Sequence, residues 1–257
     1  MTFQTISVKT DGPVALITMN RPAAMNAVCG AMLSETADAF NALEKDDTVR
    51  VVVLTGEKTY FAAGTDVLEL AGDNADAAFD AYARFLKTAL TFKKPVIAAV
   101  AGYAFGAGFE LALLADIVIA GNNARFGFPE ITLGVLPQLG GAALLAARIG
   151  KAKAAEMIMT GRHLSAEEAF AAQIVSRVVD TSLLTEEAVQ TAFRVAQMPS
   201  FAVQAAKKAV SVIAETAENQ AICDQTAARL SFLTPEAKEA LAALSEKRAP
   251  DFSKTRV

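Results

Sequence analysis

The chain has 257 residues, of which 53% are hydrophobic and 20% are charged, as in globular rather than disordered proteins. A formal net charge of −4 argues against general binding to nucleic acid or to anionic membranes. Two cysteines, Cys29 and Cys223, stand far apart in no metal-like spacing, so we expect unpaired thiols and a cytoplasmic location.

No membrane segment or secretory signal is expected. The most membrane-like apolar run, 96–109, has only 14 residues, whereas a helix needs about 20 apolar residues to cross a bilayer. The N-terminal sequence MTFQTISVKT lacks a basic stretch followed by an apolar core. The apolar run is therefore interpreted as part of a buried core.

Strand and helix patterns alternate along about the first two thirds of the chain. The run VALITM is followed by the turn-forming sequence NRP, as at the end of a strand. The run VRVVVLT is β-branched and almost wholly apolar, which favours a strand covered on both faces in a parallel sheet. We expect strands over 14–19, 49–55, 96–101, 117–120 and 174–179, and helices over 31–45, 75–92, 108–114, 142–149 and 151–159.

The rest of the chain has helical patterns. Ser165 and Glu168 form a capping-box pattern that opens a helix. Further helices are expected over 185–197, 200–215, 219–232 and 235–246. Because no low-complexity linker precedes it, this tail is interpreted as an appendage or an oligomerisation element rather than an independent domain.

The segment 95–130 carries the strongest signal for chemistry. An apolar run leads into the glycine-rich turn GYAFGAG and then Glu110, and a second apolar run leads to Glu130. Glycines between a buried strand and a helix let a reactive group approach bare backbone N–H groups. A glutamate in apolar surroundings is costly unless it is paired or used. The two glutamates therefore suggest an acid/base pair that faces one substrate.

Simpler interpretations apply to several residues. Glu110 alone could be a surface or capping residue, and Glu130 an ordinary carboxylate at a helix start. Asp66 is expected to cap the helix that follows it rather than to take part in chemistry. His163 is expected in a surface loop. Lys207 and Lys208 are expected on a solvated helix face.

Five segments taken in order resemble the crotonase superfamily, and within it most closely enoyl-CoA hydratase. They are NRP with the following NA at 26–27, FAAGTD at 61–66, PVIAAVAGYAFGAGFE at 95–110, FGFPE at 126–130 and EKRAPDF at 246–252. One of these motifs alone would be weak, but their order and spacing together are specific. The glycine turn also invites a dinucleotide-binding interpretation, although its order is reversed relative to G-x-G-x-x-G.

The resemblance implies an α/β fold in which ββα turns form a crotonase-like spiral. It implies a spiral core over 1–195 and a C-terminal helical trimerisation region over 196–257, with homotrimers or homohexamers as the assembly. The implied substrate is an acyl-CoA thioester of fatty acid metabolism. Coenzyme A arrives with the substrate, so no cofactor and no metal are expected.

The resemblance also assigns roles to residues. Backbone N–H groups of Thr65 and Ala107 would form the oxyanion hole for the thioester oxygen. Glu110 would draw a proton from water, and Glu130 would deliver a proton to the carbon next to the carbonyl. The implied substrate-binding residues are Ala63, Thr65, Asp66, Val67, Leu68, Ala107 and Lys247.

The chain departs from the family pattern at several positions. Alanine at 107 in place of the commoner glycine suggests an ordinary backbone conformation there. Many hydratases carry a lysine just after N-R-P, but Ala23 and Ala24 stand here, so phosphate contacts are expected from Arg21 or Lys247. The segment PQLGGA replaces the usual P-G-A-G-G-T beside the acyl pocket, which leaves the acyl preference open.

The sequence therefore predicts an enoyl-CoA hydratase that adds water reversibly to trans-2-enoyl-CoA. Relatives that only shift a double bond commonly keep just the second glutamate, so retention of both favours hydration. Two alternatives stay open: a Δ3,Δ2-enoyl-CoA isomerase or other crotonase-type acyl-CoA chemistry, and a non-catalytic acyl-CoA-binding subunit.

Overall fold

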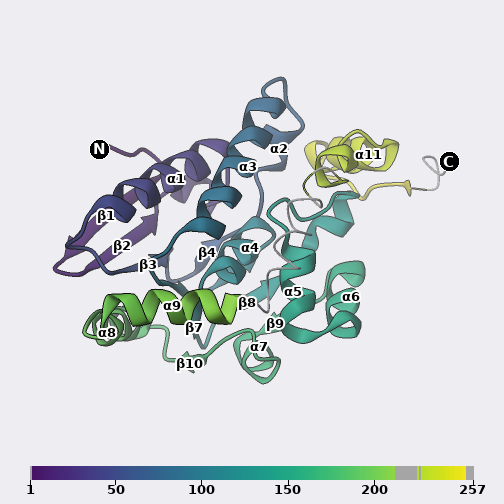
Figure 1. The fold of residues 1–257 in the computed structure, drawn as a ribbon. Helices are drawn as coiled ribbons and strands as arrows, with labels where there is room; N and C mark the ends of the chain where they lie inside the picture. The colour runs from purple at the N-terminus through teal and green to yellow at the C-terminus, as the bar shows by residue number, and fades with distance from the viewer. Residues whose placement is uncertain (1, 212–224, 226, 253–257) are drawn as a thin grey trace.

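A computed structural model of the chain describes residues 2–211, 225 and 227–252 (Figure 1). A six-stranded sheet has the order β1-β2-β3-β5-β7-β10. Strands β1 (Ile6–Asp11) and β2 (Val14–Met19) pair antiparallel, and every other pair in this sheet is parallel. The parallel strands are β3 (Val51–Thr55), β5 (Val96–Val100), β7 (Ile117–Gly121) and β10 (Arg177–Val179).

Helices cover both faces of this sheet, because its central strands are apolar on both sides. Every residue of β3 and β5 is buried, as the sequence predicts for a parallel strand. Alternate residues such as Val51 and Val53 pack against α8 (Leu184–Ala196) on one face. The intervening Val52 and Leu54 belong to the larger core on the other face, with α1 (Gly30–Lys45) and α3 (Ala75–Thr91) (Figure 1).

A second sheet, with the order β4-β6-β8-β9, is absent from the sequence-based prediction. Its strands have three residues each: β4 (Tyr60–Ala62), β6 (Tyr103–Phe105), β8 (Arg125–Gly127) and β9 (His163–Ser165). The first three are parallel neighbours, and β9 is antiparallel to β8. His163 is exposed as expected, but the prediction of a loop was wrong because this residue pairs with Gly127 in the sheet.

The two sheets are built by repeating ββα units, which confirms the spiral. In each unit one strand joins the large sheet, the next joins the small sheet, and a helix follows. The units are β3-β4 with α2 (Val67–Leu70) and α3, β5-β6 with α4 (Ala107–Leu114), and β7-β8 with the 3₁₀ turn η2 (Pro129–Leu133) and α5 (Gly141–Ile149). Because β4, β6 and β8 are parallel neighbours, the segments that follow them lie at one edge of the small sheet.

The remaining predicted elements largely agree with the structure. The capping box at α7 (Ala166–Ala171) is present, since the Ser165 side chain accepts the N–H of Glu168 and Glu168 accepts the N–H of Ser165. Strand β10 is shorter than predicted because Ile174 and Val175 lie in the turn before it. The other helices are α6 (Lys151–Thr160), α9 (Ser200–Ser211) and α11 (Pro235–Ser245).

The predicted helices over 200–215 and 219–232 fall partly outside the described residues, and Cys223 also lies outside them. Cys29 is a free, buried thiol, as expected. None of the described helices combines the length and the hydropathy that a membrane crossing requires.

Lys207 corrects the prediction of a solvated face for α9. Its side chain is only 15% exposed, and its Nζ lies 2.9 Å from Asp116 and donates to the carbonyl of Lys94 at 3.0 Å. Lys208 is exposed, as predicted. Lys207 therefore attaches α9 to the edge formed by β5 and β7.

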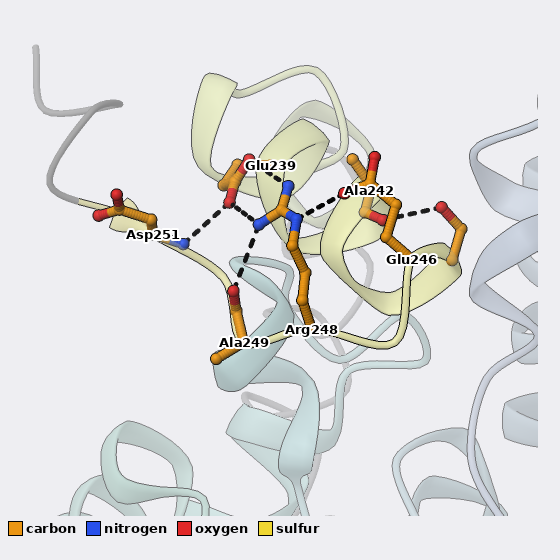
Figure 2. A network of polar contacts seen from close by, with 7 residues as sticks. Glu239, Ala242, Glu246, Arg248, Ala249 and Asp251 are labelled. Atoms are coloured by element: carbon orange, nitrogen blue, oxygen red, sulfur yellow. Dashed lines mark hydrogen bonds and ion pairs between the residues drawn. The ribbon is translucent and has the colours of Figure 1, made fainter.

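Arg248 is the centre of a hydrogen-bond network near the C-terminal end of the described chain. Arg248 donates to both carboxylate oxygens of Glu239 at 2.6 and 3.1 Å and to Glu246 at 2.5 Å (Figure 2). Glu239 also accepts the N–H of Asp251 at 2.9 Å. The hydrogen bonds from Arg248 lower the pKa of Glu239 to about 2. The network ties the segment after α11 back onto that helix.

Asn26 links the end of β2 to the small sheet. It is fully buried, with a positive φ of 56°. Its Oδ1 accepts the N–H of Arg21 at 2.8 Å, and its Nδ2 donates to the carbonyls of Met19 at 3.3 Å and Phe61 at 3.1 Å. One side chain therefore satisfies three backbone groups.

We predict that Asn26→Ala lowers the free energy of unfolding by about 2 kcal/mol, because it leaves buried backbone groups without partners. Urea unfolding at equilibrium measures the change. Asn20→Ala is the matched control, since Asn20 is exposed and such substitutions usually stay within about 0.5 kcal/mol. Equal stability of the two variants would contradict this role.

Candidate active site

The loop after β4 leaves the backbone N–H of Thr65 free of the bridge that the loop makes with Val28. An isolated parallel bridge joins Val28 to Thr65. It uses the N–H of Val28 on the Gly64 carbonyl and the N–H of Asp66 on the Val28 carbonyl, both at 2.8 Å. In such a bridge the central residue's own N–H points away from the partner strand. The N–H of Thr65 is therefore directed away from Val28.

Asp66 fixes the same loop and does so as the sequence predicts. Its side chain caps α2 by accepting the N–H of Glu69 at 3.3 Å. It also forms an ion pair with Arg21 at 2.8 Å, and Arg21 donates to the carbonyl of Ala27 at 2.9 Å. Arg21, one of the two expected phosphate contacts, is thus engaged in holding the loop.

The loop after β6 presents the N–H of Ala107 at the start of α4. Gly106 has a φ of 48°, whereas Ala107 is the first helical residue and has no positive φ, which confirms its ordinary conformation. The first N–H groups of a helix have no partner within it and are free to bind an anion. A Cβ on Gly108 would lie 2.6 Å from the carbonyl oxygen of Ala62, so the first turn of α4 packs closely on the end of β4.

Glu110, on α4, is fully buried and is held by backbone N–H groups alone. Its Oε2 accepts from Gln138 at 3.0 Å, and its Oε1 accepts from Leu139 at 2.6 Å and Gly141 at 2.7 Å. Gly141 begins α5, so the carboxylate also faces the positive end of a helix. A Cβ on Gly141 would approach Glu110 Cγ to 2.7 Å, which explains the glycine.

Glu130, in η2, is buried without such donors. It is 5% exposed, and no described residue hydrogen-bonds to either carboxyl oxygen. The hydroxyl of Thr65 is likewise buried with no hydrogen-bond partner among these residues. A Cβ on Gly106 would lie 2.3 Å from Glu130 Oε1, which places this carboxyl against the turn before Ala107. Buried polar atoms without hydrogen-bond partners are rare in folded proteins, so these atoms mark a candidate functional site.

The two carboxyl groups differ in acidity for a physical reason. Burial raises the pKa of Glu110 to about 7, while its three backbone donors act in the opposite direction. Burial, together with the nearby charge of Glu110, raises the pKa of Glu130 to about 8. Near neutral pH, the hydrogen-bonded group can therefore be an ionised base while the other is a protonated acid.

The other expected site residues fall into two groups. Ala63, Val67 and Leu68 lie in or just after the loop that carries Thr65, and Leu68 is 62% exposed. Lys247 is exposed beyond α11, and its side chain forms no hydrogen bond or ion pair with the described residues. Among the described residues, no hydrogen bond or ion pair therefore joins the Lys247 side chain to the two loops.

Sequence reasoning missed the donors to Glu110. Gln138, Leu139 and Gly141 donate through backbone N–H groups. Almost every residue type has such a group, so the sequence does not reveal these donors. The glycine pair at 140–141 was the available signal, since it indicates close approach of a backbone to another group.

The structure is a ββα spiral that carries a pair of buried carboxyl groups and the backbone N–H groups of Thr65, in a loop, and Ala107, at the start of a helix. This combination defines a protein of the crotonase class. A family model described as enoyl-CoA hydratase/isomerase matches residues 9–255, and the chain belongs to that family.

Named relatives agree with this assignment. The chain is 45% identical to a probable enoyl-CoA hydratase of Mycobacterium tuberculosis over 77% of each protein. It is 44% identical to the 2,3-dehydroadipyl-CoA hydratase of Escherichia coli over 72% of each. An enoyl-CoA hydratase/isomerase structure from Pseudoalteromonas atlantica superposes with a TM-score of 0.90 at 30% identity, covering 97% of this chain and 100% of that one.

We predict that Glu130→Gln gains stability relative to the wild type as pH rises. In the folded protein Glu130 ionises near pH 8, whereas in the unfolded chain it ionises near its ordinary pKa of 4.5. Wild-type stability therefore falls across this interval, and glutamine escapes the loss because it cannot ionise. Urea unfolding of both proteins at about pH 5.5 and about pH 8.5 measures the difference.

Glu239→Gln is the control. With a pKa of about 2, Glu239 stays ionised across the interval, so this variant should keep a constant difference from the wild type. The same constancy in Glu130→Gln would show that Glu130 is not desolvated.

Proposed function

We propose that this protein hydrates trans-2-enoyl-CoA thioesters reversibly to 3-hydroxyacyl-CoA. The observation that carries the proposal is the pair of buried glutamates, one held by three N–H groups and the other held by none. Hydration needs a base for water and an acid for carbon, and the unequal surroundings supply both at one pH.

The proposed oxyanion hole is formed by the N–H groups of Thr65 and Ala107. Attack on the β-carbon moves the electron pair of the double bond toward the thioester oxygen, which becomes an enolate oxygen. Two fixed N–H donors stabilise that charge better than they stabilise the ground state. Support comes from the two loops, which follow neighbouring parallel strands, and from the close packing of α4 on the end of β4.

Proton transfer completes the proposed reaction. Water forms a bond to the β-carbon as Glu110 takes its proton, and the α-carbon then takes the proton of Glu130. The cycle leaves Glu110 protonated and Glu130 ionised, so a proton must return through solvent before the next turnover. Because the two pKa values, about 7 and about 8, lie close together, this reversed state is only slightly unfavourable. A reversible reaction requires such a balance.

No step of this mechanism transfers an electron or needs a Lewis acid, so we propose that no metal or redox cofactor takes part. We further infer a cytoplasmic homotrimer or homohexamer assembled through residues 196–257. Exposed apolar side chains in this region support association, since Phe201 is 86% and Leu233 is 66% exposed.

We predict that Glu110→Gln and Glu130→Gln each lower kcat for hydration of crotonyl-CoA by at least roughly 10², the usual contribution of a general acid or base. Loss of the absorbance of the conjugated thioester measures the rate. Glu156→Gln is the control, because Glu156 is an exposed residue of α6.

Two outcomes would identify the alternatives. An isomerase would keep its turnover of a 3-enoyl-CoA in Glu110→Gln. A non-catalytic subunit would bind acyl-CoA tightly and leave the absorbance of crotonyl-CoA unchanged in the wild type.

We predict that Gly106→Ala abolishes most of the activity, because the new Cβ would meet Glu130 Oε1 at 2.3 Å and displace the proposed acid. Gly12→Ala is a matched control for backbone strain. Gly12 has a φ of 51°, close to the 48° of Gly106, but nothing lies within 4 Å of its added Cβ. Equal activity of the two variants would show that the contact with Glu130 is unimportant.

A further inference from the structure

We propose that the acyl pocket of this protein is built for an enoyl-CoA whose far end carries a carboxylate. The inference rests on the proposed function and names the substrate class of that site. It comes from a cavity of about 260 Å³ that is lined by residues of α3, by Gln138 and by the C-terminal residues Gln225 and Arg229. Its lining includes Phe79, Tyr82 and Gln138 together with Gln225 and Arg229.

The cavity adjoins the catalytic groups through direct contacts. Gln138, in its wall, donates its backbone N–H to Glu110. Tyr82, in the same wall, donates its hydroxyl at 2.8 Å to the carbonyl of Val28, the residue bridged to Thr65. The charge of Glu110 is among the causes that raise the pKa of Tyr82, after burial. An acyl chain with its thioester at the two loops can therefore extend into this space.

C-terminal residues are held against the wall of the cavity. The side-chain amide of Gln225 donates to the carbonyl of Gln138 at 3.2 Å, and the Ser231 hydroxyl accepts the N–H of Leu136 at 3.3 Å. The rings of Phe79 and Phe232 meet edge to face, with centroids 5.7 Å apart. These contacts hold the polar side chains of Gln225 and Arg229 in the lining of the cavity, where an alkyl chain end would need an apolar surface.

Arg229 is the group that distinguishes a carboxylate from an alkyl end. Its guanidinium lies 5.3 Å from the centre of the Phe79 ring and forms an ion pair with Asp76. The Asp76 side chain is 84% exposed, and such surface pairs contribute little stability. A substrate carboxylate inside the cavity can therefore replace Asp76 and gain a pair of hydrogen bonds from the planar guanidinium.

A negative charge beside the cavity limits the preference for a substrate with a terminal carboxylate. Asp80 also borders the cavity, is exposed, and opposes a second negative charge. An alkyl end, in contrast, would cover Arg229 and Gln225 without giving them a hydrogen-bond partner. We therefore expect a selectivity of about tenfold rather than several thousandfold.

Two substrates of equal chain length test the inference: trans-2-hexenoyl-CoA and trans-2-hexenedioyl-CoA, which differ only in the terminal carboxylate. We expect the wild type to have a kcat/KM about tenfold higher for the dioyl substrate. Arg229→Met should reduce this ratio to about one, mainly through a higher KM for the dioyl substrate. Asp80→Asn should raise the ratio, because it removes the repulsion.

Asp76→Asn is the matched control. It breaks the same ion pair as Arg229→Met but keeps the cation, so the ratio should hold or increase. A wild-type ratio of one or less, or equal losses for both substrates in Arg229→Met, would overturn the inference. Crotonyl-CoA, run in parallel, tests the proposed hydration itself: an enzyme that hydrates it without preferring the dioyl substrate disproves the inference alone.

Discussion

The site depends first on the carboxylate of Glu110 and the three backbone N–H groups that hold it. A buried carboxylate with no donors would stay protonated at neutral pH and could not act as a base. Here the donors come from residues 138–141, so the start of α5 is fixed against α4. The same helix, α4, begins with Ala107, so a single rigid element positions both the N–H donor and the base of the proposed reaction.

The difference between the two glutamates follows from backbone geometry rather than from residue type. Both side chains are chemically identical and both are buried, yet only Glu110 has donors. Hydrogen bonds to the ionised form lower a pKa, and a neighbouring negative charge raises one. These effects separate the two pKa values, both of which burial raises, and they support the proposed assignment of Glu110 as the base and Glu130 as the acid. Exchange of the roles would require the 138–141 turn to be rebuilt around Glu130.

The sequence predicts β2, β3, β5 and β7 well because these strands are apolar runs, and β2 has the predicted bounds. It misses β1, a half-exposed strand with few apolar residues. It misses the small sheet because strands of three residues have no measurable period, although their carboxyl ends organise the site. Glu110 and Glu130 could be found because carboxyl groups inside apolar runs are conspicuous. The N–H donors could not, since any residue except proline supplies one. The partner of Lys207 was also out of reach, because Asp116 is distant in sequence.

Chemistry and substrate choice draw on different parts of the same residues. Gln138 donates its backbone N–H to Glu110, and the same residue lines the proposed acyl cavity. Substitution of this side chain by anything but proline leaves the donor in place, so the cavity can change without loss of the base. Phe79 and Arg229, which also line the cavity, belong to α3 and the C-terminal segment and not to the loops that carry Thr65 and Ala107. Because the groups that catalyse the proposed reaction and the side chains that line the cavity are separate, members of such a family can accept different acyl groups and still catalyse the same reaction.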